Sequence, residues 1–463
     1  MKLPIKHTLV FAFALALVSP VTAFATNGMF MIGYGAKSVG MGGVGVAYPQ
    51  DGMAAAYNPA SMTEVGQMRL DATLELFYPP RAVRQESTLL GSTDVASQDN
   101  LYPIPAIGAV MSNPYTPMAL GMAIVGAGLG TNYNQQTVDS NGNCVQNFYN
   151  PCITTLPYKK VGVFLMQMQM LPSIAYRVDE HNSFGFSLVI AMQTFRAYGL
   201  EAFGDLGFST GGGNNLTNRG NDWSFGGGYR LGWFGKYLTD DRLYLGLNYS
   251  PKVRMQRFNE YSGLFAGHGE FDIPENYSAG IAYKITPKSH IAFDVQRILW
   301  GNVRSIANLG PNAANPSDMN PNGICGVSAS NPTGNDAISS GCNLGGDEGM
   351  GFGWKSQTVY KLGADYKWSR TLTLRAGWNY GKTPIQSDQV LFNMLAPATV
   401  EQHVTFGFTQ ALDKDSDFSL TFMHAFQKTI KGPTAFPVSG TQGDNASISM
   451  SQTSLSLAYG LQF

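Results

Sequence analysis

The segment Ser454-Leu455-Ser456-Leu457-Ala458-Tyr459-Gly460-Leu461-Gln462-Phe463 alternates strictly between two kinds of side chain. Its apolar positions are Leu455, Leu457, Tyr459, Leu461 and Phe463, and the positions between them are small or polar. A β-strand points successive side chains to opposite faces, so the segment has one apolar face and one small, polar face. About ten residues is also the length that a tilted strand needs to cross a bilayer. The segment therefore predicts a membrane-spanning strand.

The same five apolar residues resemble the C-terminal signal by which outer-membrane barrels are recognised for insertion. The resemblance implies two expectations. The chain lies in the outer membrane of a bacterial cell, and it is inserted there by the barrel-assembly machinery.

Alternation of this kind recurs along the chain from residue 69 onward, for example over residues 184–192, 243–249 and 418–426. Segments of about ten residues with period-two alternation are typical of transmembrane strands. A soluble β-sandwich or propeller also alternates. The number of strands, the small residues on the second face and the lack of a repeat of fixed length favour one all-β transmembrane antiparallel barrel.

The composition agrees with a sheet whose outer face meets lipid. Charged residues make up 13% of the 463 residues, whereas a typical soluble protein has about 25%. Aromatic residues reach 12%, and there are 54 glycines. The formal net charge of −1 gives no indication of a nucleic-acid partner.

The N-terminal residues have the features of a secretory signal peptide. Lys2 and Lys6 precede an apolar run over residues 9–18, and Ala23-Phe24-Ala25 follows as a cleavage site. A membrane anchor is the alternative, but spanning needs roughly 20 apolar residues and this run is shorter. We therefore expect residues 1–25 to be removed. No long apolar stretch follows them, so the rest of the chain can span a membrane only as a closed barrel.

Four cysteines fit an exported protein. Cys144 and Cys152 lie in one Gly/Asn/Pro/Ser-rich segment, and Cys325 and Cys342 lie in another. Two local disulfides in external loops are the expected arrangement in an oxidising compartment, although sequence alone leaves the connectivity open. No histidine or second close cysteine accompanies either pair, so we expect no metal site.

Residues 26–68 differ from the rest of the chain because they are rich in small residues and carry almost no charge. Glycine and alanine allow close backbone approach, so the segment suits packing inside a barrel. Asn58-Pro59 is a turn signal where the segment leads to the first strand. A disordered periplasmic tail is the alternative, but disordered tails are normally charged and polar.

Within this segment, several residues resemble the N-terminal hatch of the FadL family, transporters of long-chain fatty acids and, in the TodX-like branch, aromatic hydrocarbons. The resemblance rests on Gly42, Gly43 and Gly45 in the run that ends at Tyr48, then on Asp51, and on Asn58-Pro59-Ala60. Further motifs follow in the family's order, and they are Pro274-Glu275-Asn276-Tyr277, Asp294-Val295-Gln296, Trp300, Gly363-Ala364-Asp365-Tyr366, Leu374-Arg375-Ala376-Gly377-Trp378, Thr383-Pro384 and Glu401-Gln402-His403.

The resemblance implies a barrel of about 14 strands, plugged by a small, partly helical hatch. The domains would be a signal peptide at 1–25, a hatch at 26–68 and a barrel at 69–463. A hydrophobic ligand would enter from the outer surface and leave sideways through a gap in the wall, down its concentration gradient. We expect no cofactor, no nucleic-acid partner, contact with lipid and lipopolysaccharide, and a monomer.

In fatty-acid members of the family the ligand carboxylate meets basic residues inside the barrel. The corresponding positions lead to Arg196 and Arg304 as carboxylate-binding candidates, with solvated rim charges as the alternative. The match is imperfect for both residues, which leaves a neutral hydrocarbon open as the substrate.

Other functions are less consistent with the sequence. No nucleophile elbow or histidine cluster is present, so we expect no enzymatic activity. A structural or adhesive surface barrel, or a phage receptor without dedicated transport, remains an alternative. A porin for hydrophilic solutes is disfavoured by the nearly uncharged hatch segment and by the absence of a charged constriction segment.

Overall fold

The computed structural model describes residues 27–66, 68–87, 91–112, 115–134, 149, 160–205, 208–310, 342–434 and 445–463. The predicted signal peptide lies outside these residues, and so do Cys144, Cys152 and Cys325. Cys342 is buried and disulfide-bonded. The pairing of the cysteines therefore stays a prediction.

Antiparallel strands form a closed ring, as the alternation predicts. Of seventeen strands in the sheet, β2, β3 and β10 only extend the ring, which leaves fourteen. In ring order the fourteen are β1 (Met68–Tyr78), β4 (Tyr102–Ser112), β5 (Met118–Gly130), β6 (Gly162–Arg177), β7 (Asn182–Tyr198), β8 (Asp222–Tyr237), β9 (Leu243–Ser250), β11 (Asn276–Thr286), β12 (Ser289–Ile298), β13 (Gln357–Lys367), β14 (Leu372–Gly381), β15 (Gln402–Ala411), β16 (Ser416–Gly432) and β17 (Ala446–Gln462). Pairing of β17 with β1 closes the ring, and the Phe463 N–H donates to the Met68 carbonyl at 2.8 Å.

The ring's outer face is apolar and its inner face is small and polar. On β7, Phe184, Phe186 and Leu188 are exposed, whereas Ser187 and Val189 between them are buried. On β17, Leu455 is exposed while Ser454 and Ser456 face inward, and Phe463 directly after the strand is exposed as well. The exposed side chains are the ones that would meet lipid.

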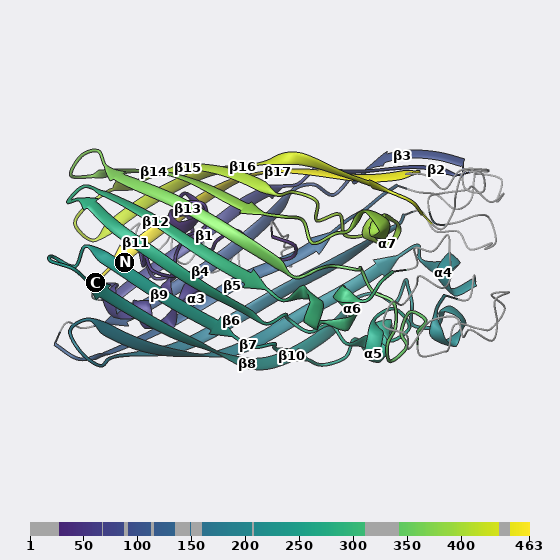
Figure 1. Ribbon diagram of the computed structural model, residues 1–463, viewed down its shortest axis with the longest axis horizontal. Helices are drawn as coiled ribbons and strands as arrows, with labels where there is room; N and C mark the ends of the chain where they lie inside the picture. Colours follow the sequence, from purple (N-terminus) through teal and green to yellow (C-terminus); the bar gives the residue numbers. More distant parts are fainter. Residues whose placement is uncertain are drawn as a thin grey trace, which may run out of the picture.

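The two ends of the barrel differ in their connections (Figure 1). At the end where the chain terminates, turns such as 178–181 and 287–288 are short. At the opposite end, the segments 199–221 and 299–356 are long. The short elements at that end are α4 (Glu201–Asp205), η2 (Thr210–Gly213), η3 (Asn259–Tyr261), α5 (Ala266–Gly269), η4 (Trp300–Asn302), α6 (Arg304–Ala307), η6 (Ser387–Gln389) and α7 (Val390–Asn393), together with the added strands β2 (Arg81–Ser87), β3 (Gly91–Ala96) and β10 (Arg254–Met255).

Among the described residues, no helix is both long and apolar enough to cross a membrane.

Residues 27–66 lie inside the ring, in the half nearer the short turns (Figure 1). We call this segment the hatch. It contains three short helices, α2 (Ala36–Val39), α3 (Ala54–Tyr57) and η1 (Pro59–Glu64), and most of its side chains are buried. Its contacts reach strands on several sides of the ring.

Glycines of the wall let the hatch backbone come close. A Cβ added at Gly377 would lie 2.0 Å from the Gly42 nitrogen, and one at Gly185 would lie 2.2 Å from the Ala60 nitrogen. Similar approaches of less than 3 Å occur at Gly108, Gly232, Gly246 and Gly363. The inner face of the wall therefore fits the shape of the hatch, because glycines stand at the positions where the hatch comes closest.

The hatch glycines singled out by sequence lie at the tightest places. Gly42 and Gly43 adopt φ of 71° and 87°, the left-handed region that favours glycine. A Cβ at Gly43 would lie 1.9 Å from the Ile32 carbonyl oxygen. A Cβ at Gly45 would lie 2.5 Å from the Tyr57 ring.

The Asn58-Pro59-Ala60 turn fastens the hatch to the wall. The Asn58 amide donates to the carbonyls of Val46 and Trp233, each at 2.9 Å, and its oxygen accepts from the Ala60 N–H. Pro59 begins η1, where a missing N–H costs nothing. Asp51 accepts from the Met53 N–H at 3.0 Å and holds the start of α3.

We expect Gly377→Ala to weaken the fit of the hatch, because the new methyl group overlaps the hatch backbone. Overpacking of this kind costs about 1–3 kcal/mol, which urea unfolding of the folded barrel would measure. Gly227→Ala is the matched control, since the nearest atom to its added Cβ is 3.9 Å away. Equal stability of the two variants would contradict the proposed close fit.

Candidate functional site

The hatch lies across the direct route through the barrel. Side chains of the wall hold it there by hydrogen bonds to its backbone. Asp294 Oδ2 accepts from the N–H groups of Gly45 and Val46, at 2.8 and 3.0 Å. Other such contacts join Gly52 to Asp71, Gly42 to Thr405 and Asn379, Ala36 to Thr421, Ile32 to Lys361, and Thr63 to Arg177. Buried backbone groups need partners, and here many of them come from side chains of the wall.

A buried ionic cluster adds to this attachment. Lys37 of the hatch lies 2.9 Å from Asp417 and 3.6 Å from Asp71. Arg69 pairs with the same two carboxylates, at 2.7 Å to Asp71 and 2.6 Å to Asp417. Removing one partner of such a buried set leaves an uncompensated charge, so the cluster resists withdrawal of the hatch.

The wall has a window between β4 and β5. Residues 107–112 of β4 pair with residues 119–124 of β5, but residues 102–106 pair only with β1 and residues 125–130 only with β6. Beyond this stretch the chains meet again, because the Gln98 N–H donates to the Asn132 carbonyl at 2.8 Å. The ladder is therefore open over a limited length.

Local sequence explains the open ladder. Pro103 and Pro105 have no N–H, and proline is tolerated in a sheet where a ladder bond is not required. On the facing strand, the edge of the window is the small-residue sequence Gly126-Ala127-Gly128-Leu129-Gly130. The β5 edge is thus made mostly of small residues, and the Ile104 side chain of the β4 edge lies against it, 3.8 Å from a Cβ added at Gly126.

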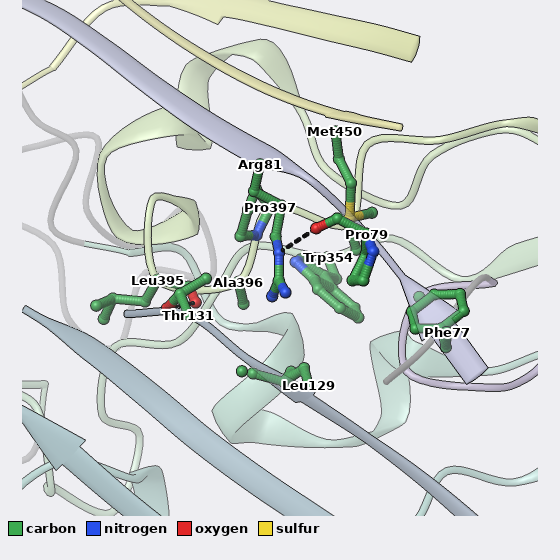
Figure 2. Close-up of a pocket in the computed structure, with 13 residues that line it drawn as sticks. Phe77, Pro79, Arg81, Leu129, Thr131, Trp354, Leu395, Ala396, Pro397 and Met450 are labelled. Carbon is green, nitrogen blue, oxygen red and sulfur yellow. Dashed lines mark hydrogen bonds between the residues drawn. The ribbon is translucent and has the colours of Figure 1, made fainter. Parts of the chain in front are cut away.

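An apolar chamber lies inside the barrel beside the window (Figure 2). Its free volume is about 20 Å³, so its own side chains nearly fill it and a ligand must displace some of them. The lining comes from the window edge, the β1–β2 junction, the hatch and the segment after α7, and comprises Gly28, Phe77, Pro79, Arg81, Leu129, Gly130, Thr131, Trp354, Leu395, Ala396, Pro397, Ala398 and Met450.

Arg81 is the one charged side chain among these lining residues, and no sequence motif pointed to it. It is buried, and its guanidinium donates to the carbonyls of Pro79 and Asp99 and to the Tyr102 hydroxyl. Figure 2 shows its side chain ending beside Trp354. The chamber can therefore take an apolar solute, and Arg81 is the charged group that such a solute would meet there.

The two predicted basic residues lie elsewhere and are not brought together. Arg196, on β7, stacks on the rings of Phe164 and Tyr198, with 4.8 and 5.8 Å to their centroids. Arg304, on α6, pairs with Glu270 at 2.7 Å and with Glu348 at 3.0 Å. Neither lines the apolar chamber, and their role toward a ligand carboxylate stays a prediction.

The Arg304 cluster is part of the structure at the long-loop end. Burial alone would raise the pKa of Glu270, but hydrogen bonds from Arg304 and Arg257 hold the pKa of that carboxyl below its ordinary value. Arg304 is thus already neutralised by protein carboxylates. Elsewhere among the described residues, no group of three or more His, Cys, Asp or Glu side chains could hold a metal ion.

A larger hollow, of about 760 Å³, lies on the outer face of β6 to β11. Its lining includes exposed aromatic side chains such as Tyr176, Phe184 and Tyr249. These belong to the face that would meet acyl chains, so the hollow is part of the lipid-facing surface.

Comparison with protein families gives one full-length match. The model for "Outer membrane protein transport protein (OMPP1/FadL/TodX)" matches residues 18–462. Among curated proteins, an uncharacterized protein in the 5′ region of a phosphoenolpyruvate carboxykinase gene of Chlorobium limicola is 37% identical over 97 residues. That alignment covers 20% of this chain and 46% of the relative, so it spans less than half of the relative's length.

Solved structures share the fold. The toluene transporter TodX of Pseudomonas putida is 20% identical, with 93% of this chain and 99% of that chain covered and a TM-score of 0.62. The toluene transporter TbuX of Ralstonia pickettii is 17% identical, with coverages of 93% and 98% and a TM-score of 0.57. A FadL homologue of Pseudomonas aeruginosa is 14% identical, with coverages of 96% and 99% and a TM-score of 0.60.

We expect Leu129→Trp to fill the remaining space of the apolar chamber and to weaken binding of a hydrophobic ligand such as radiolabelled oleate about tenfold or more. Leu120→Trp is the matched control, because Leu120 lies on the same strand but is 46% exposed on the outer face. Wild-type affinity in the Leu129 variant would show that the ligand binds somewhere else.

Proposed function

The chain belongs to the OMPP1/FadL/TodX family of outer membrane transport proteins, and on this premise we propose how it works. It carries hydrophobic compounds, long-chain fatty acids or hydrocarbons, passively from the outer surface into the membrane. The exit is the window between β4 and β5. The apolar chamber beside the window, nearly filled in this conformation, is the last binding point before the exit.

The observation that carries the proposal is the apolar chamber next to an open ladder. Burying apolar surface is favourable by roughly 25 cal/mol per Å², so an apolar solute gains by moving from water to such a lining. Unpaired backbone at membrane depth is tolerated only where protein or a cavity covers it. A permanent break in the wall is therefore consistent with a functional opening.

The fixed hatch supports a sideways exit. A hydrophilic pore would need an open axis, but the hatch occupies that axis and its backbone is bonded to β1, β6, β12, β13, β14, β15 and β16. A solute that leaves through the window does not have to break these bonds. The attachment thus favours a lateral route over a porin-like one.

The same proposal includes the division of the chain and its assembly. We propose a signal peptide at 1–25, a hatch at 26–68 and a barrel at 69–463, inserted as a monomer by the barrel-assembly machinery. Contact with membrane lipid and lipopolysaccharide follows from the apolar outer face. Exposed Leu455 and Phe463 on the last strand support recognition by that machinery.

A disulfide across the window tests the lateral exit. Ala106 and Val125 follow directly on the last paired residues, Ile107 and Ile124, and both are buried on the inner side. We expect the Ala106→Cys/Val125→Cys variant to lose most uptake of oleate or toluene into cells when oxidised, because the cross-link closes the opening. Reduction should restore uptake.

The control variant is Thr73→Cys/Ala458→Cys, a buried pair in the intact ladder between β1 and β17. Oxidation of that pair should leave uptake unchanged. Full uptake by the oxidised window variant, with the cross-link verified by mass spectrometry, would exclude the window as the exit.

A further inference from the structure

A second internal cavity lies between the hatch and the wall, and it is polar. It has a free volume of about 40 Å³, enough for roughly three water-sized groups. The hatch side contributes Phe30 to Tyr34, Val46, Ala56 and Tyr57. The wall side contributes Gln169, Arg230, Asn248, Ser250, Ile273, Asn276, Ser278, Asp294, Gln296 and Lys361.

Arg230 is a buried cation in this cavity without a counter-ion. Its side chain is 7% exposed, and among the described residues no carboxylate oxygen lies within 4.0 Å of it. Its Nη1 donates to the Ala56 carbonyl, but its Nε has no hydrogen-bond partner there. Buried charges in proteins are normally paired, so a guanidinium at membrane depth without a nearby carboxylate is suited to binding an anion.

The other two charges of the cavity do not supply that anion. Lys361 donates to the Ile32 carbonyl at 3.0 Å and has no ion pair within the described residues. Asp294 holds the hatch through Oδ2, while its Oδ1 has no hydrogen-bond partner in the described part of the chain. Two cations and one carboxylate give the lining a formal charge of +1, which one monovalent anion would neutralise.

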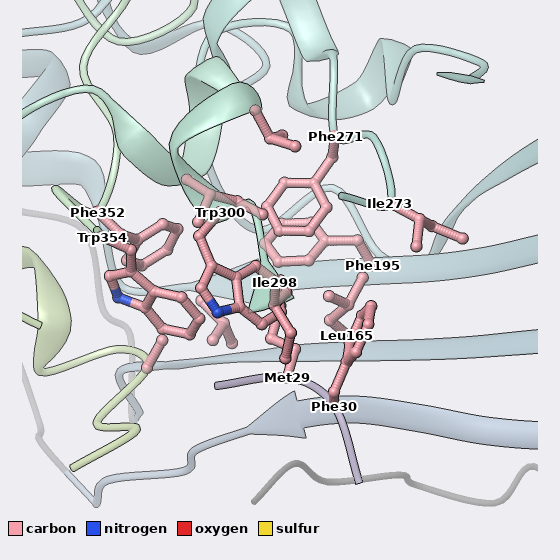
Figure 3. Packing of buried hydrophobic residues seen from close by; sticks show 14 of the residues in the cluster. Met29, Phe30, Leu165, Phe195, Phe271, Ile273, Ile298, Trp300, Phe352 and Trp354 are labelled. Carbon is pink, nitrogen blue, oxygen red and sulfur yellow. The ribbon is translucent and has the colours of Figure 1, made fainter. Parts of the chain in front are cut away.

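The cavity borders an apolar region. Phe30 and Ile273 line it and also belong to a buried cluster with Trp300, Phe195 and Ile298 (Figure 3). A molecule with an anionic head and an apolar body could therefore place its head in the cavity and its body toward this cluster. An inorganic anion has no apolar body and would therefore gain nothing from the neighbouring apolar cluster.

We propose that the polar cavity binds the carboxylate of an amphiphilic ligand, with Arg230 as the residue that holds it. This inference rests on the proposed function and adds a carboxylate site between the hatch and the wall, whose lining shares no residue with that of the apolar chamber. A guanidinium binds a carboxylate through two parallel N–H···O bonds, and the Nε of Arg230 is one unused donor for such a pair. The three heavy atoms of a carboxylate match the room available.

Binding to the purified full-length protein tests the proposal with oleate and oleyl alcohol, which share a tail and differ in the head group. We expect Arg230→Met to weaken oleate binding about tenfold or more, and to leave oleyl alcohol binding within about twofold of wild type. Arg230→Lys keeps the positive charge but lacks the paired N–H donors of a guanidinium. Its affinity for oleate should therefore lie between those of the wild type and Arg230→Met. Arg297→Met is the matched control, because Arg297 on β12 lines neither cavity and donates to the Thr358 hydroxyl, and this variant should bind both ligands as the wild type does.

Binding of sodium benzoate distinguishes two kinds of ligand that could carry the carboxylate, a free aromatic acid and a long-chain amphiphile. Benzoate binding that depends on Arg230 would identify a free aromatic acid as a ligand, and dependence for oleate alone would identify the head group of a longer amphiphile. Either result supports a carboxylate site.

Unchanged oleate binding in Arg230→Met would overturn the proposal. An equal loss of both oleate and oleyl alcohol would also overturn it, because Arg230 would then act only by holding the hatch at Ala56. A wild-type protein that binds neither ligand would instead refute the proposed transport function. Heat-modifiable mobility on a gel confirms that each variant is folded.

Discussion

A strand that faces lipid must have its backbone hydrogen bonds satisfied by its neighbours, because no water is there to replace them. Because of this requirement, the fourteen strands close into a ring. The unpaired stretch between β4 and β5 departs from it and is therefore a candidate opening. Pro103 and Pro105 remove two donors at the window edge, so less backbone is left without a partner. The facing edge consists mostly of small residues, Gly126, Ala127, Gly128 and Gly130. The unpaired stretch between β4 and β5 thus lies beside the apolar chamber.

The same requirement acts on the hatch. Its helices are short, so most of its backbone groups cannot be satisfied within the segment. Wall residues such as Asp294 and Lys361 supply the partners, and wall glycines such as Gly377 give the space. A hatch fixed by so many separate contacts is a permanent plug. The open ladder then offers the solute a route that leaves the plug in place.

Sequence predicted the architecture well because strand alternation is a local property. The barrel, the apolar outer face, the family and the transport of hydrophobic compounds are confirmed. The window and its chamber could not be located, because strand register depends on residues distant in the chain. Arg81 and Arg230 were missed for the same reason. Arg304 was selected by position along the chain, yet its charge is satisfied by Glu270 and Glu348.

The central claim is that the hatch stays in place while solute passes. Locking the hatch to the wall tests it most directly. A Cβ added at Gly40 would lie 2.9 Å from the Thr421 hydroxyl oxygen, a spacing suited to a disulfide in a Gly40→Cys/Thr421→Cys variant. The account predicts that cells carrying the oxidised, cross-linked variant take up oleate or toluene at the same rate as cells with the reduced protein. Uptake that is abolished by oxidation and restored by reduction would contradict it, because the hatch would then have to move.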